Sequence, residues 1–188
     1  MNTTAKSTSA GKQSISTKSM VLIAMFTAVL CISAYLSIPL PNGSHISIVN
    51  FTLLLIALSF PLEQSFFITL LWLLIGSVGV PVFPGGVAGF GYLISHLGGY
   101  ALSFLPVAIL APLLRGKQYH RIRYTIIAIL AAILIDAFGM FQWLLLGQIS
   151  LEQAFFAAFL PFLPLDLLKA VIVAQIVPAF QHLLYSAE

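Results

Sequence analysis

Six long apolar stretches follow one another along this chain, at residues 20–38, 48–60, 64–80, 91–114, 124–146 and 154–180. About 20 apolar residues suffice for a helix to cross the hydrocarbon core of a bilayer. The pattern therefore predicts an all-α integral membrane protein with six transmembrane helices. The second stretch is short, so it crosses only if it is extended into its flanks or packed where the membrane is locally thin.

The composition supports a membrane protein and excludes an ordinary soluble domain. Of the 188 residues, 60% are hydrophobic and only 7% are charged, whereas soluble domains carry about 25% charged residues. The net charge of +3 reflects where a few charges lie and does not indicate nucleic-acid binding. The lone cysteine, Cys31, excludes a disulfide within the chain.

The basic residues predict the orientation. Seven of the eight lysines and arginines fall on one side of a six-helix arrangement. They are Lys6, Lys12, Lys18, Arg115, Lys117, Arg121 and Arg123. Basic residues concentrate on the cytoplasmic side of membrane proteins. We therefore expect both termini in the cytoplasm and a multi-pass protein of the bacterial inner or plasma membrane.

The ends of the chain differ in composition from its apolar middle. Residues 1–19 are rich in Ser, Thr and Lys and predict a solvated cytoplasmic tail. A signal peptide fits less well, because the next apolar run is too long and no small-x-small cleavage site closes it. Residues 20–182 form the expected membrane domain, and residues 183–188 a cytoplasmic C-terminal end.

The last apolar stretch is interrupted by Pro161 and Pro164. We expect residues 152–160 to form a short helix near the membrane surface. A new helix then begins with Pro164 in its first turn, where the missing N–H of proline does no harm.

Two charges lie inside this last stretch, Asp166 and Lys169. Each costs roughly 2.5–3.5 kcal/mol at mid-bilayer, so they predict a binding site or a pair. At i and i+3 they share a helix face. Either Lys169 binds an anionic ligand, or it neutralises Asp166 while Asp166 accepts a ligand N–H; a purely structural ion pair is the alternative. Asp136, also intramembrane, either joins this site or pairs with Lys169.

Eight of the 13 glycines fall between Gly76 and Gly99. Glycines permit positive φ and close backbone approach, which suits a loop folded back toward a pocket. We expect Gly86 to contact ligand there, and Phe83, Phe90 and Tyr92 to wall the pocket. A hinge with helix-packing glycines is the alternative. The chain has no Gly-x4-Gly-Lys-Ser/Thr motif, so any ATP chemistry belongs to a partner.

Two segments carry a family resemblance: the loop Pro81-Val-Phe-x-Gly-Gly86 with Gly-Tyr-Leu and Gly-Gly-Tyr after it, and Leu160-Pro-Phe-x-Pro-x-Asp-x-x-Lys-Ala170. Together with the six-helix pattern they resemble the biotin-specific substrate-binding (S) components of energy-coupling factor (ECF) transporters, the BioY family. The resemblance implies an S-component fold that captures biotin from outside. It also implies partners, a transmembrane coupling (T) protein and two ABC-type ATPases.

Some residues depart from the family pattern and leave other vitamins open. Ser95-His96-Leu97 stands where the family usually has Gly-Pro-Thr or Gly-Pro-Ser, and Asn50 where a glutamine is common. Lipoate is therefore an alternative ligand within the same fold. An autonomous secondary carrier is a further alternative, although such carriers favour inverted repeats and none is evident.

Ala24 and Ala28, four residues apart near the inner end of the first helix, give it a smooth face that another helix can approach. In the family such a pattern resembles the surface that docks on the coupling protein; packing within the chain is the alternative. We expect no enzyme, because no nucleophile with a base lies near Asp166 in sequence. The isolated His96 does not predict a metal site, and no cofactor is expected.

Overall fold

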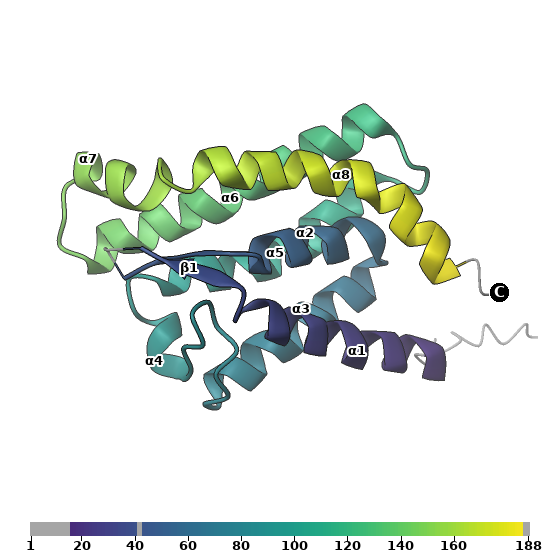
Figure 1. Ribbon diagram of the computed structural model, residues 1–188, viewed down its shortest axis with the longest axis horizontal. Coiled ribbons are helices and arrows are strands. Elements are labelled where there is room, and N and C mark those ends of the chain that lie inside the picture. The colour runs from purple at the N-terminus through teal and green to yellow at the C-terminus, as the bar shows by residue number, and fades with distance from the viewer. Residues whose placement is uncertain (1–15, 41–42, 186–188) are drawn as a thin grey trace, which may run out of the picture.

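The chain forms a bundle of helices with a small β-hairpin at one end (Figure 1). This computed structural model describes residues 16–40 and 43–185. Its longer helices are α1 (Thr17–Ser33), α2 (Val49–Ser59), α3 (Leu62–Ser77), α5 (Gly98–Arg115), α6 (Arg121–Leu146) and α8 (Leu163–Tyr185). The short elements are β1 (Ser37–Pro39), β2 (His45–Ser47), α4 (Phe90–Leu93), α7 (Leu151–Ala154) and the π-helix η1 (Phe155–Phe159).

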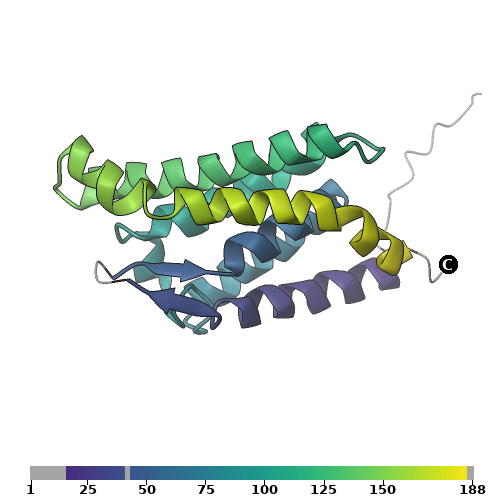
Figure 2. The ribbon, with the colours of Figure 1, turned by 45° about the horizontal axis from the view of Figure 1, so that its top comes forward.

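The short helix α2 lies at the centre of the bundle, in contact with α1, α3, α5, α6 and α8 (Figure 2). Seven of its 11 residues are buried. A helix that is apolar on every side fits such a place, because it needs no polar face for solvent. The remaining contacts link α5 to α6, α6 to α8, α3 to α5, and α1 to α3.

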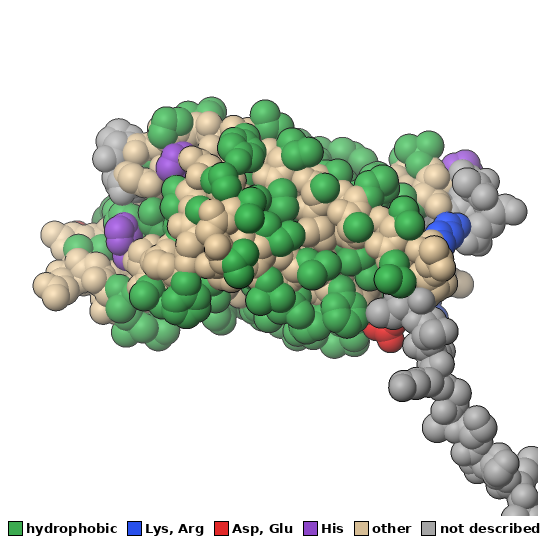
Figure 3. All heavy atoms as spheres, turned by 90° about the horizontal axis from the view of Figure 1, so that it is seen from below, with side chains coloured by type: hydrophobic (Ala, Val, Ile, Leu, Met, Phe, Trp, Pro, Cys, Tyr) green, Lys and Arg blue, Asp and Glu red, His purple; other side chains and the backbone are tan. Residues whose placement is uncertain are grey.

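Each predicted apolar stretch overlaps one of the longer helices, although the bounds differ by several residues. Three of these helices, α5, α6 and α8, are long and apolar enough to cross a membrane by length and composition, whereas α1, α2 and α3 are shorter apolar helices. Apolar side chains cover the middle of the molecule in Figure 3, and the lysine, arginine and acidic side chains visible there lie at one end. This surface is that of a membrane protein.

The expectation of an all-α chain is wrong in one place, the linker after α1. There β1 and β2 pair antiparallel, with Ser37 opposite Ser47 and Pro39 opposite His45. The first helix also ends at Ser33, well before the predicted boundary at residue 38. Strands this short carry too little alternation to show in the sequence.

The expected helix 91–114 is also interrupted, because the chain turns at Ser95 between α4 and α5. The Ser95 hydroxyl donates to Tyr92 O and accepts from Leu97 N, at 2.7 and 3.3 Å. A serine that bonds to nearby backbone in this way offers the chain an alternative to the helix. From α6, Gln142 Nε2 donates to Leu93 O and Ser95 O, so the carbonyls freed by the break are bonded.

The predicted break in the last stretch is confirmed. α7 and η1 run from Leu151 to Phe159, and α8 begins at Leu163 with Pro164 in its first turn. A capping box between Ser150 and Gln153 starts α7.

The predicted N-terminal tail mostly lies outside the described residues. Residues 1–15 are not described, and residues 17–19 already belong to α1.

The loop between α5 and α6 lies at the same end as the start of α1 and the end of α8 (Figure 1). Arg115, expected to be one of the cations in this loop, is instead buried. Its guanidinium donates to Leu58 O and Phe60 O, which are carbonyls at the C-terminal end of α2. Arg115 therefore caps α2 and fixes α5 against it.

Candidate functional site

A small cavity with both polar and apolar lining residues lies at the hairpin end of the bundle, where the hairpin, the glycine loop at residues 81–89 and helices α2, α4, α5, α6 and α8 meet. Its volume is about 30 Å³ by the space open to the centre of a water-sized sphere. Such a volume holds one or two waters, because a single water needs roughly 10–15 Å³. The polar lining residues are Ser44, His45, Ser47, Asn50, Tyr92, Tyr100, Asp136 and Asp166; the apolar ones are Pro84, Leu97, Ala101, Phe104 and Phe162.

Asp166 is the most extensively bonded side chain of the cavity. Its Oδ1 lies 2.8 Å from Lys169 Nζ, and its Oδ2 accepts from Asn50 Nδ2 at 2.8 Å. Lys169 Nζ also donates to Ser47 O of β2 at 2.8 Å. Asp166 is 4% exposed and faces the cavity, while Lys169 lies behind it and joins α8 to the hairpin. Both arise from the first two turns of α8, which begins at Leu163 and has Pro164 in its first turn.

Asp136 of α6 faces the same cavity, and its carboxyl group is close enough to that of Asp166 to interact with it electrostatically. Asp136 is fully buried. By hydrogen-bond geometry neither of its oxygens has a partner among the described residues, although the carboxyl groups of Asp136 and Asp166 lie close enough for a proton to be shared between them. A buried carboxyl without partners is costly, so it indicates a place where a ligand donor binds.

The glycine loop contributes Pro84 and supports the cavity from one side. Its Phe83 is fully buried and stacks on Tyr92 at a centroid distance of 4.8 Å, so Phe83 lies behind a residue that lines the cavity. Gly85, with φ of +80°, leaves no room for a Cβ because the His45 ring lies against it. The loop and the hairpin therefore pack on each other.

Two expected site residues in this loop region lie away from the lining. Gly86 adopts φ of +71° and lies nearest to the Tyr35 ring. Phe90 is 63% exposed, and neither residue is among those that line the cavity. Positive φ explains the glycine at residue 86 without any ligand contact.

Tyr100 of α5 is a site residue that sequence reasoning missed. It lines the cavity, and its hydroxyl donates to Ala158 O of η1. Gly139 of α6 makes room for the Tyr100 ring, which occupies the place that a Cβ would take. In the sequence, Asn50 stands out as a departure from the family pattern. An amide in an otherwise apolar helix is also a reason to expect a role in a binding site.

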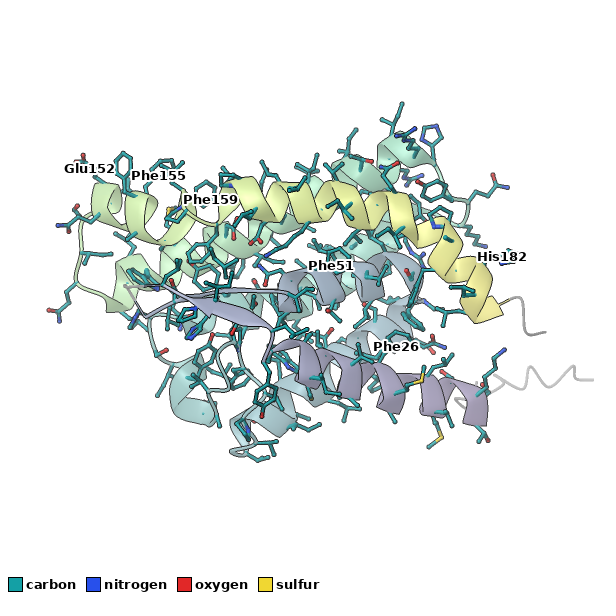
Figure 4. The ribbon with its side chains drawn as sticks, in the orientation of Figure 1. Phe26, Phe51, Glu152, Phe155, Phe159 and His182 are labelled. Carbon is teal, nitrogen blue, oxygen red and sulfur yellow. The ribbon has the colours of Figure 1, made fainter. Side chains whose placement is uncertain are left out.

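The remaining expectation concerns the surface of α1. Ala24 and Ala28 are both exposed on this helix, while Phe26 between them points into the bundle and packs on Phe60 and Phe180 (Figure 4). The alanine face is therefore not used for packing within the described chain.

A bundle of apolar helices with one small polar cavity at one end defines a membrane protein that binds a small molecule. The family model for the BioY family matches residues 4–186. The chain belongs to the BioY family. It is 32% identical to biotin transporter BioY2 of Lactococcus lactis subsp. cremoris over 82% of this chain and 85% of the relative. It is 28% identical to the probable biotin transporter BioY of Pyrococcus horikoshii, over 84% and 94%.

Solved structures show the same fold. The crystal structure of the S-component for biotin from an ECF-type ABC transporter superposes with a TM-score of 0.76 at 21% identity, covering 87% of this chain and 90% of that one. The crystal structure of FolT bound with folic acid superposes with a TM-score of 0.59 at 20% identity, covering 92% and 97%.

Proposed function

We propose that this chain is the biotin-binding S component of an ECF-type transporter. The observation that carries the proposal is the pair of buried carboxyl groups, Asp136 and Asp166, on one small cavity. The ureido ring of biotin offers two N–H donors, and a carboxyl group accepts hydrogen bonds through its unprotonated oxygens. Membership of the BioY family and the names of its relatives support the same ligand.

We infer distinct roles for the two carboxyl groups from their contacts. Asp166 is held by Asn50 and Lys169, so its position is set before ligand binds. Asp136 lacks partners among the described residues and gains a bond only when a donor arrives. Phe104, Phe162 and Leu97 supply the apolar walls that the thioether ring needs.

Lipoate fits this cavity less well. It has a carboxylate and an apolar dithiolane ring but no N–H group. Bound lipoate would leave the Asp136 carboxyl buried without a hydrogen bond. A site that is built to accept a ligand N–H discriminates strongly against a ligand that lacks this group.

Equilibrium binding to the purified full chain tests the proposal. We expect one biotin to bind per chain, and we expect the affinity for lipoate to be lower by a factor of roughly a hundred or more. Lys169→Ala and Asp166→Asn should each weaken biotin binding roughly tenfold or more, because a charge-assisted hydrogen bond is lost in a dry site. Tighter binding of lipoate than of biotin would refute the ligand; two folded variants that bind like the wild type would refute the site.

The cavity is smaller than the vitamin, so binding requires movement. Ser44 and His45 of the hairpin segment lie over the cavity, and a hydrogen bond from Lys169 Nζ to Ser47 O ties β2 to α8. Outward movement of the hairpin is the proposed route for biotin.

The proposal includes orientation and partners. Six helices cross the cell membrane, with both termini and the α5–α6 loop in the cytoplasm and the cavity facing outward. The exposed cations Lys117, Arg121 and Arg123 at the opposite end from the cavity support this orientation. ATP hydrolysis belongs to two ATPases joined through the T protein. Neither catalysis nor autonomous secondary transport is part of the proposal.

A further inference from the structure

A groove lies between α5 and α6, away from the vitamin cavity. Leu110, Leu114, Leu130 and Leu134 form its rim, and Ala111 and Ala131 form its floor. The alanines are buried, whereas Leu110, Leu114 and Leu130 are exposed. Small residues under large ones leave a hollow of about 150 Å³ that is lined almost entirely by apolar atoms. We call it the α5–α6 groove.

The groove continues to a cationic end. Leu114, Ile127 and Leu130 line both this hollow and the next one, which also contains His120 and Arg123. His120 and Arg123 in turn line an open hollow with Lys117 in the α5–α6 loop. Because the three hollows share lining residues, they form one depression. It begins at the apolar α5–α6 groove and ends at three basic side chains at the end of the bundle.

The cations at this end are placed to bind an anion. Arg123 Nε donates to Leu114 O at 2.7 Å, and its guanidinium packs on Gly116, where a Cβ would lie 2.9 Å from Nη1. Its remaining N–H groups have no hydrogen-bond partner among the described residues, and no described carboxylate pairs with Lys117 or Arg123. A held guanidinium with free N–H groups matches a phosphate oxygen pair.

We propose that the α5–α6 groove binds one anionic phospholipid, with its phosphate on Lys117, His120 and Arg123 and an acyl chain along Ala111 and Ala131. The occupant is a lipid because the two halves of the depression require a charged head and an apolar tail in one molecule. Basic pockets beside membrane helices near the cytoplasmic surface bind acidic headgroups for the same reason. The site lies at the opposite end of the bundle from the vitamin cavity.

Lipid titration of the delipidated full chain, followed by native mass spectrometry, tests the headgroup. Phosphatidylglycerol and phosphatidylcholine with the same acyl chains are the probes. We expect one phosphatidylglycerol to bind about tenfold more tightly than phosphatidylcholine. Each Lys or Arg adds roughly 1 kcal/mol toward an anionic headgroup, whereas the choline cation of phosphatidylcholine cancels the charge of its phosphate. Excess glycerol 3-phosphate should not displace it. Equal binding of the two lipids, or full displacement by glycerol 3-phosphate, would overturn the proposal.

Matched variants locate the site. Arg123→Gln and Lys117→Gln should each reduce the preference for phosphatidylglycerol, whereas Arg121→Gln removes the same charge two residues away, on another face of α6, and should leave it unchanged. Lys117 is exposed, so its replacement does not endanger folding.

A second pair of variants tests the tail. Ala131→Leu fills the groove and should weaken both lipids, while Ala137→Leu on the same helix should weaken neither. An equal effect of Arg121→Gln and Arg123→Gln, or of the two alanine variants, would contradict the assigned site.

Discussion

At the scale of single residues, the most informative group is a buried carboxyl that has no hydrogen-bond partner by geometry among the described residues. Asp136 is fully buried and neither oxygen is bonded within the described residues. An unpaired buried polar group costs about 1–3 kcal/mol. A chain that retains such a group gives up stability for an interaction made only with a ligand.

Asp136→Leu should therefore separate stability from function. In the vitamin-free protein we expect the unfolding midpoint to rise by a few degrees, because about 1–3 kcal/mol is recovered. Biotin binding should weaken roughly tenfold or more. Thermal unfolding and equilibrium binding on the same preparation measure both, with Asp136→Asn, which keeps an acceptor, as the intermediate case. A fall in the midpoint with unchanged binding would assign Asp136 a structural role instead.

The sequence predicts the charged part of this site better than its neutral part. Asp166, Lys169 and Asp136 are visible because charges are expensive inside an apolar helix. Asn50 and Tyr100 are not, because their roles depend on partners far along the chain: Asn50 bonds to a residue 116 positions away. The burial of Arg115 is not predictable for the same reason. From the sequence, a cation at a helix end cannot be distinguished from a solvated charge in a loop, because its carbonyl partners are not known.

At the scale of elements, the packing of α5 on α6 sets the position of a cavity wall. Gly139 has no Cβ, and the Tyr100 ring fills that space. Tyr100 then reaches Ala158 O of η1. The absence of a Cβ at Gly139 therefore allows α5, α6 and η1 to meet at this wall of the cavity.

Gly139→Ala should move that wall. The added Cβ requires Tyr100 to shift, which we expect to cost about 1–3 kcal/mol and to weaken biotin binding, despite the better helix propensity of alanine. Gly91→Ala is the matched control, because a Cβ there meets nothing within 4 Å. Thermal unfolding and biotin titration distinguish the two. Similar behaviour of both variants would mean that the Tyr100 contact does not position the wall.

The apolar runs predict where the longer helices lie, but they do not predict where these helices end or are interrupted. Hydrophobicity continues through Ser95, yet the chain turns there because the serine side chain bonds to nearby backbone. The hairpin between α1 and α2 was missed because each strand has only three residues. Pro161 and Pro164 allowed the last break to be predicted, since proline constrains the backbone in any context.

At the scale of the whole molecule, the two ends should face opposite sides of the membrane. Glu152 lies at the end of the bundle opposite His182 (Figure 4), and Gln118 lies in the α5–α6 loop. In a Cys31→Ser background, we expect Glu152→Cys to react with an impermeant thiol reagent applied to intact cells and Gln118→Cys to react only after permeabilisation. The reverse pattern would invert the orientation.

The exposed alanine face of α1 is the proposed contact with the coupling protein. We expect Ala24→Trp with Ala28→Trp to leave biotin binding intact and to reduce ATP-driven uptake in cells to background, because bulky rings prevent close helix approach. Met25→Trp with Val29→Trp has the same spacing on exposed neighbours and should reduce uptake less. Loss of binding together with uptake would mean that the alanine face supports the fold.

The small volume of the cavity governs the time course of binding as well as its strength. A cavity of about 30 Å³ cannot hold biotin, so a diffusing vitamin succeeds only when it meets a molecule whose hairpin has moved aside. Observed association rates should then level off at high biotin concentration, at the rate of that movement. The same movement limits release, so a captured vitamin stays bound long enough for a scarce coupling partner to arrive.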